Sequence, residues 1–229
     1  MKRLLLILLI SAPFYLSAQS QYTIKLALEG PSLSEQPNER LHSKRQQLLT
    51  AHYDQVPADA IDQVTVALVS PDGKVLEKHT AWLTQGKTLL SIDGSEQLSF
   101  ETVTSGAQFV IQHSNHLPLA TKPITDQEAS VIDFTSPESL QGKAYILENG
   151  KAYAIAGNLG DMHYERSAYI NAMDLFFMRS ALVAQELKPK SGAYNTADVN
   201  LDGKVDQLDA QIVQKNSDTL HAADAPSIR

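Results

Sequence analysis

The stretch "DVNLDGKVDQLD", which runs from Asp198 to Asp209, decides how the second half of this chain is interpreted. It gathers four aspartates and one asparagine in a short loop, although like charges at such distances repel one another. Side-chain oxygens fall at loop positions one, three, five, nine and twelve, which are Asp198, Asn200, Asp202, Asp206 and Asp209. A calcium ion requires oxygen donors at this spacing, and a bound divalent cation would relieve the repulsion.

The remaining positions of the loop fit the same interpretation. Gly203 stands at position six, where a calcium-binding loop turns sharply, and Lys204 at position seven would contribute its backbone carbonyl. Val205 at position eight is apolar, as expected of a residue that fixes the loop to a core. The alternative is a solvated acidic turn, because Asp-Gly also occurs in ordinary turns. The simultaneous agreement of these positions favours a site for one calcium ion.

A duplicated helical unit follows from the apolar spacing after Gly157. The segments "INAMDLFFMRSALVAQEL" (170–187) and "VDQLDAQIVQKN" (205–216) superpose at an offset of 35 residues, the distance from 170 to 205. The matched pairs are Ile170 with Val205, Asn171 with Asp206, Met173 with Leu208 and Asp174 with Asp209. One such unit cannot bury its apolar face alone, so we expect the two helices to pack together. The expected contacts join Leu208 and Ile212 to Met173 and Phe177.

The first copy of the loop departs from the second. "DMHYERSAYINAMD" runs from Asp161 to Asp174, is two residues longer and lacks the DxNxDG core. Asp161, Asn171 and Asp174 form a tentative second calcium site, to which Glu165 and Ser167 could add oxygens. The alternative is a degenerate repeat that keeps its helix and needs no metal.

The chain opens with "MKRLLLILLISAPFYLSAQS", which predicts a signal peptide over residues 1–18. Lys2 and Arg3 precede a short apolar run, and Ser17-Ala18 reads as a cleavage site. We therefore expect an exported protein whose mature chain begins at Gln19. There is no cysteine, so a core, a metal ion or both must hold the exported fold together.

Short β-rich segments separated by turn residues fill the chain up to about residue 156, and they predict an antiparallel β-sandwich of the Ig-like or prealbumin-like kind. "DQVTVALVS" places Val64, Val66 and Leu68 on one face, and Asn149-Gly150 predicts a hairpin. A short helix fits around residues 40–52. The expected organisation is a sandwich at 19–156, a helical part at 157–218 with repeats at 158–185 and 194–217, and a disordered tail at 219–229.

Several classes of function are disfavoured by composition and motif. The formal charge is −7 and no basic stripe is present, which argues against nucleic acid, and no second apolar segment suggests a membrane span. No HExxH, GxSxG or phosphate-binding loop occurs, and no acidic pair can be nominated for catalysis, so we expect a non-catalytic protein. His113 and His116 stand at or just after a strand, where a separation of three should not bring their side chains together.

Two apolar features leave an alternative open. Trp82 lies in an alternating strand, where a core role is favoured over stacking on a sugar. The "FFM" segment at 176–178 is favoured as packing rather than as a partner-binding patch. A carbohydrate-binding protein that uses the sandwich face remains the alternative function.

A calcium loop with Asp at position twelve, followed directly by a helix and duplicated once, resembles the dockerin type I module. The segments "IKLALEGP", "FVIQHSNHLPLAT" and "AIAGNLGD" resemble C-terminal regions of secreted Bacteroidetes proteins, in which a β-sandwich precedes a dockerin-like pair. The resemblance implies an EF-hand-like, calcium-binding, non-catalytic module for protein–protein assembly or surface attachment. It implies a cohesin-like or other cell-surface protein as partner, a link to polysaccharide degradation with a polysaccharide as a further partner, and an extracellular, cell-surface or periplasmic location.

Overall fold

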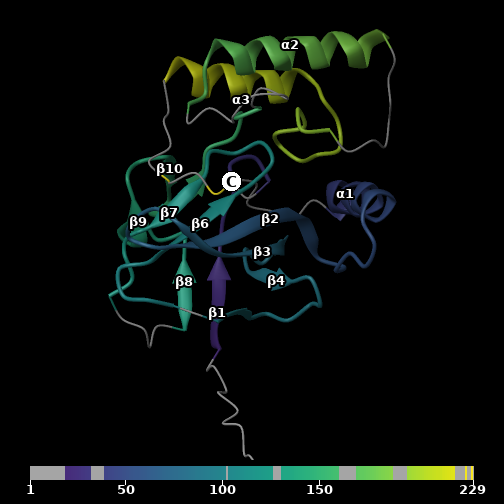
Figure 1. Cartoon of the computed structure of the whole chain (residues 1–229). Helices are drawn as coiled ribbons and strands as arrows, with labels where there is room; N and C mark the ends of the chain where they lie inside the picture. Colours follow the sequence, from purple (N-terminus) through teal and green to yellow (C-terminus); the bar gives the residue numbers. More distant parts are fainter. Residues whose placement is uncertain are drawn as a thin grey trace, which may run out of the picture.

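The structure is a computed structural model that describes residues 19–31, 39–101, 103–125, 130–159, 169–187 and 195–219, together with Ala225 and Ile228. The signal peptide predicted at 1–18 lies outside these residues. A mainly β body carries a pair of helices across one end (Figure 1). The predicted fold class, a β-sandwich followed by a small helical pair, is confirmed.

Two sheets and a hairpin make up the β body. The larger sheet has the strand order β4 (Leu89–Ser91), β3 (Val75–Thr84), β2 (Ala60–Val69), β6 (Gln108–Gln112), β7 (Leu119–Thr121) and β9 (Leu140–Gln141). The smaller sheet has the order β5 (Leu98–Phe100), β1 (Ser20–Lys25) and β8 (Val131–Asp133). β10 (Tyr145–Glu148) and β11 (Lys151–Ala154) form the hairpin predicted at Asn149-Gly150, where both residues have positive φ. A 3-10 turn, η1 (Pro137–Ser139), precedes β9.

The main core lies between the two sheets. Val64, Val66 and Leu68 of β2 point into it, as their alternation predicted, and meet side chains from the smaller sheet. Aromatic rings fill the space, with the Tyr22 and Phe109 centroids 5.1 Å apart in an edge-to-face arrangement. The β1–β8 pair is parallel, unlike the antiparallel pairing that we expected throughout. Between β1 and β8 the chain forms most of the larger sheet before it returns to the smaller one. Short strand segments in a sequence do not reveal such a crossover connection.

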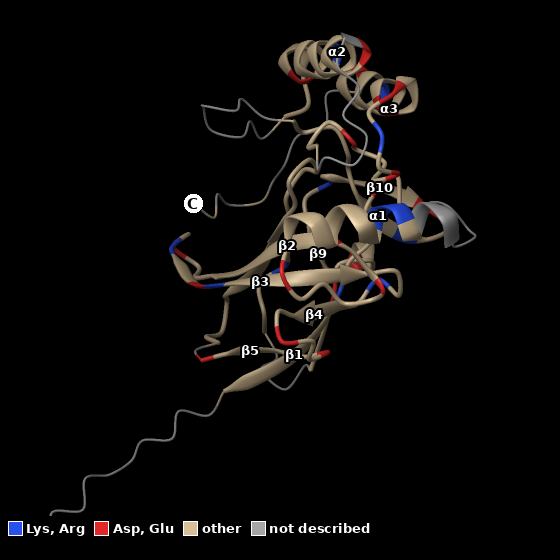
Figure 2. Cartoon of the chain, turned by 90° about the vertical axis from the view of Figure 1, so that its right-hand side faces the viewer, with Lys and Arg blue, Asp and Glu red and all other residues tan. Residues whose placement is uncertain are grey.

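The outer face of the larger sheet is covered in two places. Helix α1 (Glu39–His52) is the short helix expected around residues 40–52, and it lies beside β2 (Figure 2). Beneath it, Leu49 packs on Trp82, which is fully buried as the sequence predicted. Farther along the same face, Ile228 is buried among Ala67, Val69, Val110 and Ala120. We expected residues 219–229 to form a disordered tail, and within that segment Ile228 is seated on the sheet.

Helices α2 (Ala172–Leu187) and α3 (Gln207–Asp218) lie side by side (Figure 1). Leu117 and Ile155 of the β body share one buried cluster with Ile170, Val205 and Val213, so the pair rests on the sandwich. Within the described residues, no helix is long and apolar enough to cross a membrane.

The expected contact of Leu208 with Met173 is wrong. Met173 is 49% exposed and Leu208 is 55% exposed. Ile212, by contrast, packs against the buried cluster that the helices share with Leu117 and Ile155. The neighbouring carboxylates of Asp174 and Asp209 turn inward, and adjacent helical residues point about 100° apart. The residue before each aspartate is therefore directed outward.

Replacing Gly30 with alanine measures how closely the sandwich approaches the acidic loop. Gly30 has φ +94°, and a Cβ there would lie 2.8 Å from the Asn200 Cα. We expect Gly30→Ala to lower the free energy of unfolding by about 2–4 kcal/mol, from backbone strain plus overpacking. Gly73→Ala is the matched control, because Gly73 has φ +83° but no atom within 4 Å of its added Cβ.

The control should lose only about 1–2 kcal/mol, from strain alone. Urea unfolding of both variants gives the comparison. Equal losses would show that the close approach at Gly30 has no energetic weight.

Candidate metal centre

The acidic loop is held closed by its own first residue. Asp198 is buried, and its Oδ1 accepts a hydrogen bond from the backbone N–H of Asp202 at 3.0 Å, while its Oδ2 accepts one from Gly203 at 2.9 Å. The sharp turn predicted at Gly203 is present, with φ +84°. The carboxylate at position one therefore fixes the far side of the turn.

Asp209, at position twelve, joins the loop to α3. Its Oδ1 accepts hydrogen bonds from the backbone of Val199 at 2.9 Å and Asn200 at 3.1 Å. Its Oδ2 accepts one from the Asp206 backbone at 2.9 Å, and the Asp206 side chain accepts one from Leu208 at 2.8 Å. The Asp206 side chain also accepts the backbone N–H of Asp209, and together with the Asp206–Asp209 bond this forms a capping box, which satisfies free N–H groups at the start of α3.

The other predicted ligands lie in the same turn. Asn200 Oδ1 accepts a hydrogen bond from the Asp202 backbone at 2.9 Å, and Asp202 Oδ1 accepts one from Lys204 at 2.9 Å. The Lys204 side chain is exposed, and Val205 is buried in the cluster beneath the helices, as predicted. Among the described residues, no three His, Cys, Asp or Glu side chains converge in a metal-ligand arrangement.

The buried charges of this loop lack a full counter-charge. Burial raises the pKa of Asp198 to about 7, against the opposing charge of Arg45, and the carboxylate of Asp209 adds to the increase. Burial also raises the pKa of Asp209 to about 6, although three backbone N–H groups act to lower it. Two buried carboxylates beside further carboxylate and amide oxygens fit a hard divalent cation such as calcium.

The first repeat has the same hydrogen-bond pattern at its helix start. Asp174 is buried, and its oxygens accept hydrogen bonds from Leu159 and Asn171, both at 2.8 Å. Asn171 Oδ1 accepts one from Met173 at 2.8 Å, as Asp206 does from Leu208 in the second copy. Asp161, the remaining residue of the tentative second site, lies outside the described residues, as do Glu165 and Ser167.

Residues outside the loop hold it against the sandwich. Arg45 of α1 is buried, and its Nη1 lies 3.4 Å from the Asp198 Oδ2. The Asn115 side chain donates to the carbonyls of Thr196 at 2.9 Å and Asp198 at 3.0 Å. Leu201, at loop position four, is buried in the main core of the sandwich. The sequence carries no signal for the Arg45 contact, which joins residues 153 positions apart.

A buried polar cluster continues from Arg45 into the sandwich. Arg45 also forms an ion pair with Asp62, whose Oδ2 lies 3.1 Å from His113 Nε2. The Nδ1 atoms of His113 and His116 are 2.9 Å apart, which corrects the expectation that these side chains do not meet. The residues between them leave the strand in bends, so strand alternation no longer separates the rings. Burial and the neighbouring His113 lower the pKa of His116 to about 3.

Comparison with known proteins bears on this part of the chain. Residues 165–216 match the family model of the dockerin type I domain. The predicted resemblance of the C-terminal part to dockerin modules is thereby confirmed. None of the curated proteins compared matches the chain.

Two similar solved structures are crystal structures of the type II Cohesin-X-Dockerin complex from Acetivibrio cellulolyticus. One is a C-terminal interface mutant, with 13% sequence identity and a TM-score of 0.47. The other is an N-terminal interface mutant, with 13% identity and a TM-score of 0.45. Both alignments cover 86% of this chain and 94% of the matched chain.

Raising the pH from 5 to 7 in metal-depleted buffer should destabilise the wild-type chain relative to an Asp198→Asn variant. Because the folded-state pKa of Asp198 is about 7 instead of 3.8, the folded chain keeps a proton that the unfolded chain releases. This contribution is complete below about pH 3.8 and is lost as the pH rises through 7. His116 titrates in both proteins and cancels in the difference.

Urea unfolding at both pH values measures the effect. With saturating calcium, the free energy of unfolding of the wild type should no longer fall relative to that of Asp198→Asn, since the ion binds the ionised carboxylate. If the stability of the wild type relative to Asp198→Asn stays constant or increases from pH 5 to pH 7 in metal-depleted buffer, the assignment of a raised pKa to Asp198 is contradicted.

Proposed function

We propose that this chain is an exported, calcium-binding, non-catalytic assembly module that docks a cohesin-like protein at the cell surface. The observation that carries the proposal is an apolar face on the helical pair that no described part of the chain covers. The match to the dockerin type I model over residues 165–216 supports it.

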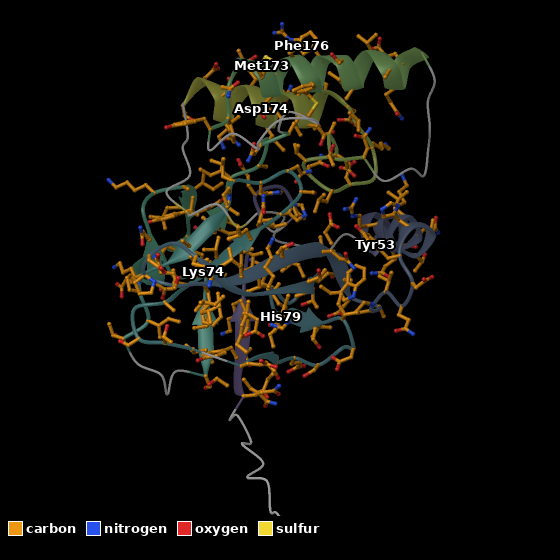
Figure 3. The ribbon with its side chains drawn as sticks, viewed as in Figure 1. Tyr53, Lys74, His79, Met173, Asp174 and Phe176 are labelled. Carbon is orange, nitrogen blue, oxygen red and sulfur yellow. The ribbon has the colours of Figure 1, made fainter. Side chains whose placement is uncertain are left out.

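The exposed face runs along α2. Met173, Phe176 and Val183 are separated by three and seven residues, so they share one side of the helix, and Phe176 is 61% exposed. Figure 3 shows Met173 and Phe176 on the outer side of α2 and Asp174 on its inner side. Leu208 adds an exposed apolar side chain at the start of α3. Apolar side chains gathered in this way mark interaction surfaces.

A groove between the two helices adjoins this face. Its volume is about 390 Å³, and its lining includes Leu175, Met178, Leu182, Ala210, Gln214 and Lys215. Apolar residues on its floor and polar residues along α3 suit a partner that buries aliphatic side chains and hydrogen-bonds at the rim.

Calcium serves this surface through the start of α3. Asp198, Asn200, Asp202, Asp206 and Asp209, with the carbonyl of Lys204, would hold the ion. The ion would supply the positive charge that the buried carboxylates lack. Asp206 and Asp209 already cap α3, so their position fixes where Leu208 and the α3 side of the groove stand. Asn171 and Asp174, with Asp161, remain a tentative second site in the first repeat.

The process that we propose for this module is polysaccharide degradation, and the alternative function is carbohydrate binding. The link to polysaccharide degradation rests on the resemblance alone. The carbohydrate-binding alternative gains no support from Trp82, because a fully buried ring cannot stack on a sugar.

Calorimetric titration with calcium tests the loop. The wild-type chain should bind calcium with a dissociation constant between about 10⁻⁷ and 10⁻³ M. Replacing Asp198 and Asp202 with alanine removes two ligands and should weaken binding at this site at least about a hundredfold, which corresponds to about 2.7 kcal/mol. Asp72→Ala with Asp93→Ala is the matched control, since both aspartates are exposed in turns of the sandwich, where each accepts a hydrogen bond from a serine hydroxyl.

The control pair should titrate as the wild type does. Unchanged affinity and stoichiometry in the Asp198/Asp202 variant would place the calcium site elsewhere.

Surface plasmon resonance against a panel of purified cohesin modules tests the docking face. Phe176→Glu should weaken binding to a recognised cohesin about 30-fold or more, because it places a charge in the centre of the apolar face. Ile92→Glu, which changes an apolar residue of the sandwich that is also exposed, at 47%, should leave binding unchanged. If no cohesin binds in calcium, or if both variants bind alike, this surface is not the docking face.

A further inference from the structure

Arg45 is a buried cation with carboxylates on both sides. Its guanidinium forms an ion pair with Asp62 of β2, and Nη1 lies 3.4 Å from the Asp198 Oδ2. Nε donates to the Ile61 carbonyl at 3.0 Å, which fixes the plane of the group. All three charged side chains are at most 3% exposed. One positive charge therefore serves a carboxylate of the sandwich and a predicted calcium ligand of the loop.

Buried charges of this kind are sensitive to the loss of a partner. Removing one member of a buried ion pair is strongly destabilising, because the remaining charge stays in a medium of low polarity. His113 Nε2 lies 3.1 Å from the Asp62 Oδ2, so Asp62 has a second polar partner. Among the described residues, Arg45 is the only cationic side chain that forms an ion pair with Asp198.

The loop is attached to the sandwich at more points than Arg45. Leu48, one turn after Lys44 on α1, lies so close to Gly203 that a Cβ there would meet it at 3.2 Å. The far end of α3 is attached as well. Asn216 and Lys215 bind the buried carboxylate of Glu29, at 2.6 and 3.2 Å.

From these contacts we infer that Arg45 is the resident counter-cation of the loop at 198–209 and the positioning residue that couples this loop to the β-sandwich. In the absence of metal, Arg45 offsets part of the charge of Asp198 and keeps the loop docked on α1. When calcium binds, the ion and Arg45 share the same carboxylate. The calcium part of this inference rests on the proposed function, whereas the role of Arg45 in the metal-free chain does not.

The coupling reaches the sandwich even though its strands supply none of the predicted calcium ligands. Asp198 connects through Arg45 to Asp62, and Asp62 to His113. A change in how Asp198 is bound therefore reaches α1 and the start of β2 directly.

Thermal unfolding of Arg45→Met at pH 8, in chelator and in saturating calcium, tests the inference. In chelator the variant should melt roughly 10 °C below the wild type, because two buried carboxylates lose their shared cation. Calcium should then raise the melting temperature of the variant more than that of the wild type, by roughly 5 °C, because the ion replaces the missing charge at Asp198. Lys44→Met is the matched control: it removes the charge of the neighbouring residue, whose Cβ lies near Gly203, and no ion pair of Lys44 is found among the described residues.

The control should behave as the wild type does in both conditions. A chelator difference between Arg45→Met and Lys44→Met below about 2 °C overturns the counter-cation role, and an equal or smaller calcium effect in Arg45→Met overturns the coupling. If the wild type shows no calcium effect, the proposed calcium site fails while the chelator comparison still decides the role of Arg45.

Hydrogen exchange on the unmodified chain gives a second measure that needs no variant, in case Arg45→Met does not fold. Calcium should slow exchange in the loop and also across residues 43–51 and 61–65. Slower exchange in the loop alone contradicts the coupling.

Discussion

The burial of Asp198 and Asp209 is the constraint on which the helical part of this fold depends. One carboxylate closes the turn at Gly203, and the other binds both the start of the loop and the start of α3. Neither can be placed in the interior at low cost unless N–H groups and cations surround it. α1 brings Arg45 to Asp198, Asn115 binds the loop backbone, and the cap of α3 supplies an N–H group to Asp209. All three contacts therefore stabilise the loop that holds the buried carboxylates.

The duplication in the sequence has a counterpart in this chemistry. In both copies an aspartate in the first helical turn accepts the N–H three residues earlier, and the residue there accepts the N–H two residues later. Because both aspartates turn inward, Met173 and Leu208 point outward at equivalent positions. The same local hydrogen bonds thus produce the packing beneath the helices and the apolar face above them.

Elements governed by local rules could be predicted from the sequence. The alternation in β2, the Asn149-Gly150 turn, the burial of Trp82 and the turn at Gly203 all follow from residue periodicity or turn chemistry. The contacts that locate the loop could not be predicted, because Arg45, Asn115 and Gly30 are each far from it in sequence. The meeting of His113 and His116 was missed for another reason: the chain leaves the strand between them. For Met173 and Leu208 the helical period was predicted correctly, but the buried face of each helix was assigned to the wrong residues. That face includes Asp174 and Asp209, and an apolar pattern does not mark buried aspartates.

The two-ended attachment of α3 has a mechanical consequence. Its first turn is tied to the β body through the loop and Arg45, and its last turn is tied through Glu29. Tension applied to the outer face of the helices would reach the sheets at both ends of α3 simultaneously. Such a load shears several buried polar contacts together and cannot peel the helix away one contact at a time.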